Sequence, residues 1–126
     1  MRKIEQQMIA AIRDINRNFW NGDNTKVERA YNSETGDFVI RVYLHGSCIA
    51  KAVGNGYPDS MAWGFTLAGY NTPTTRSRVN TLCGAFGGTS RRGVYTKLGQ
   101  AYVKRYASLV RDPSGNDTPI GNDEWF

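Results

Sequence analysis

The sequence predicts an α+β fold with an N-terminal helix, an antiparallel sheet of about four to five strands and a second helix. Apolar residues recur at helical spacing through residues 2–19 and again through residues 75–86. Between them, residues 26–67 form short runs rich in β-branched and aromatic residues, separated by turns that contain glycine. A chain of 126 residues can form one core, so we expect one domain over residues 1–111 and a mobile acidic tail over residues 112–126.

The first helix is predicted over residues 2–19 because its apolar residues form one stripe while charged residues take the other face. The stripe consists of Ile4, Met8, Ala11, Ile12, Ile15 and Phe19. We expect it to pack in the core, with a partner-binding face as the alternative. The segment over residues 20–25 is expected to end the helix, with Gly22 as the stop.

Four strands are expected next, over residues 26–31, 37–44, 48–53 and 61–67. The second is the strongest strand, because β-branched and aromatic residues occur throughout it. The turn after it contains His45, the only histidine of the chain. We expect a structural role for His45 in this turn, with a ligand or a general base as the alternative.

The second helix is expected near residues 75–86, with an apolar stripe at the spacing of one helix face. That stripe consists of Val79, Leu82, Cys83 and Phe86. Pro73 fits a turn, and Thr74 or Thr75 is expected to cap the helix by accepting a hydrogen bond from a free backbone N–H.

Three polar residues of this helix, Arg76, Arg78 and Asn80, fall off the apolar stripe and are expected to face outward. Cations at a helix start oppose the macrodipole, so stability alone does not favour them there. Two guanidinium groups beside free N–H groups suit a phosphate or a carboxylate. Ordinary solubilising surface is the alternative.

Charge is divided unequally along the chain, which has a net charge of +5 at pH 7. Residues 60–111 contain eight basic residues and no acidic residue, whereas residues 112–126 contain four acidic residues and no basic one. Without that tail the body has 16 basic and 7 acidic residues, a net charge of +9. A basic surface of this kind favours a polyanionic partner.

Basic and aromatic side chains interleave through residues 91–106, and their spacing leaves open two strands, or a strand and a helix, over residues 91–98 and 100–106. The set consists of Arg91, Arg92, Tyr95, Lys97, Tyr102, Lys104, Arg105 and Tyr106. Cations neutralise phosphates and flat rings stack on bases, which is what single-stranded nucleic-acid binding requires. With Arg76 and Arg78, these residues form the predicted binding set. Packing of the tyrosines against the sheet is the alternative.

The tail ends in Asp123, Glu124, Trp125 and Phe126, which join negative charge to two aromatic rings. We expect this tip to occupy a basic surface or to contact a partner protein. Removal of residues 112–126 is therefore expected to tighten nucleic-acid binding. A solubilising tail whose last aromatic residues dock on the core is the alternative.

Three pieces of the sequence carry a resemblance to a known family: Leu44-His45-Gly46 at a strand end, residues 69–80, and the basic-aromatic segment that follows them. They resemble a family of small bacteriophage proteins, and Thr72, Thr74, Thr75, Arg78 and Asn80 match the family's threonines, arginine and asparagine. The resemblance covers roughly residues 38–106. It implies a phage origin and expression in the cytoplasm of an infected bacterial host, and it supplies no activity.

A basic body with an acidic tail is also similar, more weakly, to bacterial and phage single-stranded-DNA-binding proteins. In those proteins the acidic tip recruits replication enzymes and competes with DNA for the body. Asp123, Glu124 and Phe126 are the residues that match this pattern. The resemblance implies a replication or transcription protein of the phage or host as a second partner.

These patterns together predict a non-enzymatic phage accessory protein that binds nucleic acid, with single-stranded DNA or RNA favoured. The alternatives are a protein that inhibits or redirects a host enzyme, and a minor virion component. No metal or cofactor is expected, because Cys48 and Cys83 lack metal-ligand spacing and no glycine-rich phosphate loop is present. No apolar run is long enough to span a membrane, so no membrane partner is expected, while an oligomer is compatible with the sequence.

Overall fold

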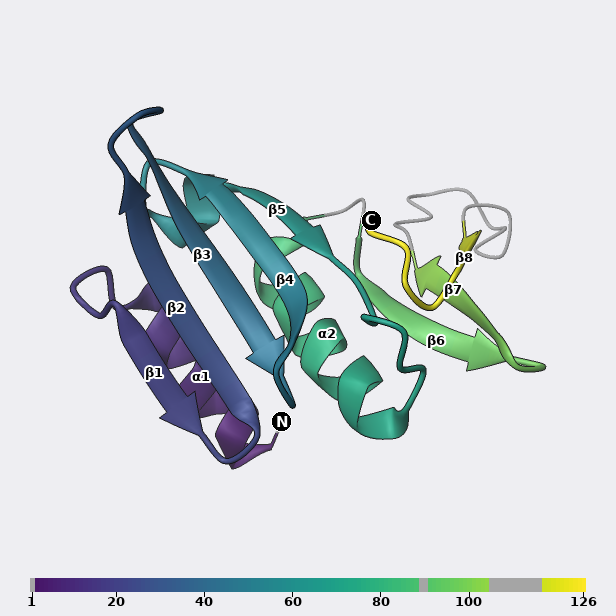
Figure 1. The fold of residues 1–126 in the computed structure, drawn as a ribbon. Coiled ribbons are helices and arrows are strands. Elements are labelled where there is room, and N and C mark those ends of the chain that lie inside the picture. Colours follow the sequence, from purple (N-terminus) through teal and green to yellow (C-terminus); the bar gives the residue numbers. More distant parts are fainter. Residues whose placement is uncertain (1, 89–90, 105–116) are drawn as a thin grey trace. The chain divides into compact units, whose positions relative to one another are not determined.

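The computed structural model describes residues 2–88, 91–104 and 117–126, and the chain divides into two compact units, Met1–Phe65 and Thr66–Phe126. The first unit contains one α-helix and an antiparallel sheet of five strands, and the second contains one α-helix and a sheet of three strands (Figure 1). The predicted α+β class is therefore confirmed. The prediction of one domain over residues 1–111 stays a prediction.

The first helix, α1 (Lys3–Arg13), is shorter than predicted. It buries Met8, Ala11 and Ile12, as expected for the apolar stripe. Asp14 already has an extended backbone, with φ −81° and ψ 95°, so the predicted continuation to residue 19 is wrong. Ile15 and Phe19, predicted to be part of the buried stripe, are 44% and 55% exposed.

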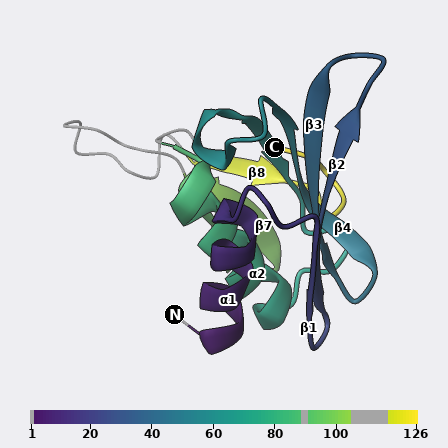
Figure 2. The ribbon, with the colours of Figure 1, turned by 90° about the vertical axis from the view of Figure 1, so that its left-hand side faces the viewer.

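The five strands of the first sheet follow one another in space as they do in the chain. They are β1 (Phe19–Gly22), β2 (Thr25–Asn32), β3 (Asp37–Leu44), β4 (Ser47–Gly54) and β5 (Ala62–Phe65). Each predicted strand is present, and β1 replaces the loop that was expected to follow the first helix. Figure 2 shows α1 on one side of this sheet, alongside β1 and β2.

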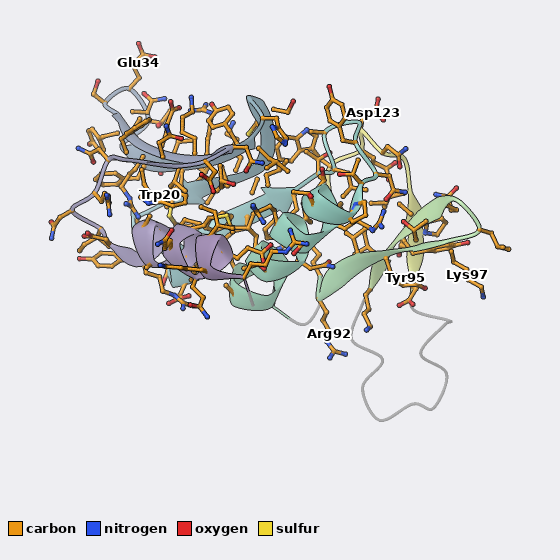
Figure 3. All side chains as sticks on the ribbon, turned by 90° about the horizontal axis from the view of Figure 1, so that it is seen from below. Trp20, Glu34, Arg92, Tyr95, Lys97 and Asp123 are labelled. Atoms are coloured by element: carbon orange, nitrogen blue, oxygen red, sulfur yellow. The ribbon has the colours of Figure 1, made fainter. Side chains whose placement is uncertain are left out.

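The register of the first sheet places apolar residues in rows across neighbouring strands. One row runs through Val27, Val42, Ala50 and Phe65, each paired with the next and each at most 2% exposed. Trp20 of β1 is also buried, and a Cβ added at Gly22 would lie 2.5 Å from its ring and 2.7 Å from Ile4 of α1. Figure 3 labels Trp20 among the side chains of this unit. These contacts place the core of the first unit between α1 and the sheet.

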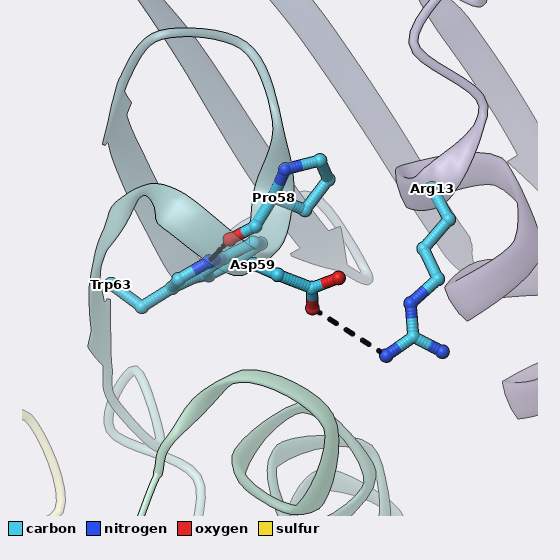
Figure 4. Close-up of polar contacts among 4 residues, drawn as sticks. All are labelled: Arg13, Pro58, Asp59 and Trp63. Atoms are coloured by element: carbon cyan, nitrogen blue, oxygen red, sulfur yellow. Dashed lines mark hydrogen bonds and ion pairs between the residues drawn. The ribbon is translucent and has the colours of Figure 1, made fainter.

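A short 3-10 helix, η1 (Pro58–Ser60), connects β4 to β5. The indole N–H of the buried Trp63 donates to the carbonyl of Pro58 at 2.8 Å, which holds this connection against β5 (Figure 4). Asp59 forms an ion pair with Arg13 of α1 at 3.7 Å, but both side chains are more than half exposed. Exposed ion pairs of this kind stabilise a fold by less than about 1 kcal/mol.

The second unit contains α2 (Pro73–Phe86), β6 (Gly93–Lys97), β7 (Gln100–Lys104) and β8 (Thr118–Ile120). The helix begins one residue after Thr72, whose hydroxyl accepts the N–H of Thr75 at 3.2 Å. The predicted caps, Thr74 and Thr75, are therefore wrong. Pro73 occupies the first helical position, where the absence of an N–H costs nothing. Val79, Leu82 and Cys83 are buried as predicted.

The segment whose structure the sequence left open forms two antiparallel strands, β6 and β7, and β8 pairs with β7 on its other side. Residues 117–126, which the sequence assigned to a mobile tail, are described by the structure and contain β8. Besides β8, this part of the chain makes a β-bridge between Trp125 and Thr66, and the carbonyl of Asn122 accepts the N–H of Gly69 at 2.7 Å. A deletion of residues 112–126 would therefore remove a strand of the second sheet.

Candidate nucleic-acid interface

The hairpin β6–β7 has one buried face and one face that carries rings and charges. Val94, Ala101 and Val103 are at most 4% exposed, and Ile120 of β8 joins them on the same face. Because side chains alternate along a strand, the residues between these buried ones lie on the opposite face. The antiparallel register aligns that opposite face as the pairs Gly93 with Lys104, Tyr95 with Tyr102, and Lys97 with Gln100.

The centre of this opposite face is a stacked pair of tyrosine rings. The ring centroids of Tyr95 and Tyr102 lie 5.4 Å apart, with an interplanar angle of 16°. Both side chains are half-buried, whereas Lys97 and Lys104 are exposed at opposite ends of the face. We call these four residues, Tyr95, Lys97, Tyr102 and Lys104, the tyrosine face. Figure 3 labels Tyr95 and Lys97, both on β6.

The carboxylate of Asp117 lies against the tyrosine face. The hydroxyl of Tyr95 donates to Oδ2 of Asp117 at 2.6 Å. This hydrogen bond, with burial and the negative charge of Asp117, raises the pKa of Tyr95 to about 12. The phenol therefore stays protonated at physiological pH and keeps its donor on the carboxylate. Asp117 directly precedes β8, so pairing of β8 with β7 brings this acidic group to the rings.

Arg76 is half-buried and folds back onto the loop before α2. Its Nη1 donates to the side-chain oxygen of Asn71 at 2.6 Å and to the Asn71 carbonyl at 3.1 Å. The same Asn71 oxygen accepts the hydroxyl of Thr96 at 2.9 Å. Arg76 thus belongs to a small polar network that joins the start of α2 to β6. An anion would compete with these bonds for its guanidinium group.

Arg78 differs from the outward-facing residue predicted by the sequence, whereas Asn80 is exposed as predicted. Arg78 is 4% exposed, so its predicted exposure is wrong. Thr75, Arg78, Val79, Leu82 and Cys83 form one buried stripe of α2 at helical spacing, and the long aliphatic stem of arginine tolerates such a position. Asn80 is exposed, but its Oδ1 accepts the N–H of Val94. This bond satisfies a donor of the edge strand β6.

The contact between Asn80 and β6 also explains a glycine. A Cβ added at Gly93 would lie 2.9 Å from Oδ1 of Asn80, closer than real side chains approach. Gly93 therefore permits the approach of α2 to the edge of β6. Of the predicted motif, Thr75 and Asn80 have structural contacts, and Thr74 is half-buried in the first turn.

The remaining predicted residues are spread over the second unit. Arg92, which Figure 3 labels, is exposed. Arg91 is half-buried, and both residues precede β6. Arg105 and Tyr106 lie outside the described residues. Asp123 and Glu124 are exposed, and Phe126 is half-buried. Trp125 is 49% exposed and lies beside Thr66 through its β-bridge. The structure therefore brings together four members of the predicted binding set on the tyrosine face.

Sequence reasoning missed two polar residues of this region, Asn71 and Asp117. Asn71 stands before Thr72 and Pro73, and a polar residue just before a helix start is a candidate to anchor the loop. Asp117 was assigned to the tail, and no local pattern indicates its distant partner Tyr95, 22 residues away. A usable signal was the spacing of two residues between Tyr95 and Lys97, and again between Tyr102 and Lys104. This spacing is typical of residues that share one face of a strand.

Within residues 2–88, 91–104 and 117–126, no group of three or more His, Cys, Asp or Glu side chains could hold a metal ion. Neither of the two described α-helices is both long and apolar enough to cross a membrane. In comparison with known proteins, the family model described as Kyanoviridae Gp96 protein matches residues 1–126. No curated protein and no solved structure matches the chain.

Proposed function

The chain belongs to the Kyanoviridae Gp96 protein family, a family of phage proteins, and from this premise we propose that it is a non-enzymatic accessory protein that binds single-stranded nucleic acid on its tyrosine face. Membership confirms the phage origin implied by the sequence resemblance. The motif likeness and the likeness to single-stranded-DNA-binding proteins remain predictions.

The observation that supports this proposal is the stacked pair Tyr95–Tyr102 with a lysine at each end of the same strand face. Stacking of a base on an aromatic ring stabilises a complex by roughly 1–3 kcal/mol and tolerates any base. Residues two positions apart in a strand are separated by roughly 6.6 Å, so Lys97 and Lys104 can reach phosphates next to a stacked base. Bases of an intact duplex are already stacked on one another, which favours a single strand.

Charge in the second unit supports a polyanionic ligand. Its described residues include six cations, Arg76, Arg78, Arg91, Arg92, Lys97 and Lys104, and three acids, Asp117, Asp123 and Glu124. Two of the cations, Lys97 and Lys104, are exposed on the tyrosine face itself. Neutralised phosphates release counterions, so the affinity is expected to fall steeply with salt.

The test is fluorescence anisotropy of labelled single-stranded DNA and RNA at about 50 and 200 mM salt. The full chain is expected to bind at least one of them. The double variant Lys97→Ala/Lys104→Ala is expected to bind more weakly, with a log–log salt slope lower by roughly 1.4, because each phosphate contact on a single strand contributes roughly 0.7.

The matched control is Lys3→Ala/Lys51→Ala, which removes the same charge from two exposed lysines of the first unit. It is expected to leave the salt slope almost unchanged. Absence of binding to both nucleic acids at about 50 mM salt would contradict the proposal. Equal losses in the two double variants would show that only net charge matters, and would exclude the tyrosine face as the site.

Regulation by the acidic C-terminal segment is the second part of the proposal, and Asp117 gives it a defined group. A phosphate about 4 Å from the Asp117 carboxylate would be repelled by roughly 1 kcal/mol in water. Asp117→Asn keeps an oxygen that accepts the Tyr95 hydroxyl and removes the charge. We expect this variant to bind single strands roughly fivefold more tightly.

Asp123→Asn is the control for Asp117→Asn, because Asp123 is an exposed acid of the same segment, whereas Asp117 accepts the hydroxyl of Tyr95. Its effect is expected to stay within about twofold at 200 mM salt, where separations beyond roughly 8 Å are screened. An affinity gain no larger than that of the control would exclude regulation through Asp117.

A further inference from the structure

The turn of the hairpin β6–β7 combines an unusual backbone with an unusual residue. Leu98 and Gly99 are the two loop residues between the paired Lys97 and Gln100, with φ values of 52° and 79°. Positive φ at both positions is typical of a type I′ turn, which favours Asn, Asp or Gly at its first position. A leucine there holds a left-handed conformation that costs about 1–2 kcal/mol.

Leu98 is also 98% exposed, the highest value among the exposed large hydrophobic side chains of the described residues. Its side chain is therefore not stabilised by burial, and leucine is not a residue that this turn favours. The hairpin between β3 and β4 also has positive φ at its two loop residues, with 51° at His45 and 81° at Gly46. There the strained residue has partners: the backbone N–H of His45 donates to Asn24 at 2.8 Å, and its ring lies 3.2 Å from the Asn24 amide.

Leu98 is the first loop residue after Lys97, which is the last residue of the tyrosine face in β6. In β6, Tyr95 and Lys97 are followed directly by the exposed leucine, and Gln100 faces Lys97 across the turn. A strand bound along Tyr95 and Lys97 would thus meet Leu98 where it leaves the hairpin. Apolar side chains, leucine among them, insert between base steps and partially unstack them. Insertion removes the exposed leucine from water and offsets the cost of separating the bases.

We propose that Leu98 is a wedge that inserts at the step where a single strand enters a duplex, so that the ligand is a junction between single-stranded and double-stranded nucleic acid. This inference rests on the proposed function, because the tyrosine face would hold the single-stranded arm. The tip of the hairpin would separate the first base pair of the duplex arm.

The test compares the full chain with Leu98→Asn. Asparagine before glycine is the preferred pair for this turn, so the variant is expected to unfold at the same or a higher temperature. Its affinity for a forked duplex is expected to fall roughly tenfold or more, while its affinity for an unpaired strand stays within about twofold. Leu98→Met, which keeps an apolar wedge, is expected to retain fork binding.

A second measurement follows the bases directly. A 2-aminopurine placed in the first base pair of the fork is expected to brighten when the full chain or Leu98→Met binds, and to stay dim with Leu98→Asn. Equal fork affinity and equal fluorescence for the full chain and Leu98→Asn, with the single strand still bound, would overturn the wedge and leave the proposed function intact. Failure of the full chain to bind any strand would overturn both.

Discussion

Replacement of Arg29 by methionine is expected to lower the free energy of unfolding by roughly 2–4 kcal/mol. Arg29 lies in β2, is 5% exposed, and reaches the end of α1. Its guanidinium group donates to the carbonyls of Ile12, Asp14 and Arg17, the last two at 2.8 and 2.7 Å. Methionine has a similar length but no donor, so these acceptors would lose their partner.

The energy of this contact arises from two effects. The last carbonyls of a helix have no partner within the helix, and those that are buried must be satisfied by another group. A cation at the helix C-terminus also interacts favourably with the macrodipole, by about 0.3–1 kcal/mol. Burial lowers the pKa of Arg29 while Asp14 raises it, but an arginine stays charged at physiological pH.

Urea unfolding followed by circular dichroism measures the effect, and Arg13→Ala is the control. Arg13 lies in the last turn of α1, but its side chain is half exposed and its ion pair with Asp59 is 3.7 Å long. The control is expected to change the unfolding free energy by less than about 1 kcal/mol. Arg29→Lys is expected to recover only part of the loss, because one ammonium group cannot replace the planar fork. A loss for Arg29→Met as small as that of the control would refute the capping role.

Arg29 also explains where sequence reasoning overextended the first helix. Ile15 and Phe19 continue the helical spacing of Met8 and Ile12, so local pattern alone predicts one longer helix. The end is held by Arg29 of β2, which donates to the carbonyls of Ile12, Asp14 and Arg17, a tertiary contact that no local window contains. The strands were easier to predict, because β-branched residues and glycine turns are local signals.

The second helix shows the same limit of local sequence patterns at one residue, Arg78. An apolar stripe of Val79, Leu82 and Cys83 predicted the buried face correctly. Arg78 is adjacent to that face, and whether such a residue lies inside or outside depends on what packs around its stem. Likewise, the pairing of Tyr95 with Tyr102 follows from a turn at Leu98–Gly99, and leucine does not mark a turn of this type.

Tyr102→Leu is expected to weaken single-strand binding roughly tenfold to a hundredfold, the effect of losing about 1–3 kcal/mol of base stacking. Tyr102 is the better residue to remove, because it lies on the central strand β7, between Tyr95 of β6 and Pro119 of β8. Tyr95 also holds Asp117, so its removal would change ring and carboxylate together. Tyr102→Phe keeps the flat ring and is expected to bind nearly as well as the full chain.

The loss in Tyr102→Leu must be separated from a loss of folding. A cross-strand aromatic pair contributes about 0.5–1.5 kcal/mol to stability, so the variant is expected to remain folded, which a thermal melt checks. Tyr57→Leu removes a tyrosine that is 57% exposed in the first unit and serves as the matched control, with binding unchanged. If Tyr102→Leu and Tyr57→Leu bind equally well, stacking on the tyrosine face does not hold the strand, and the lysines alone would have to account for the affinity.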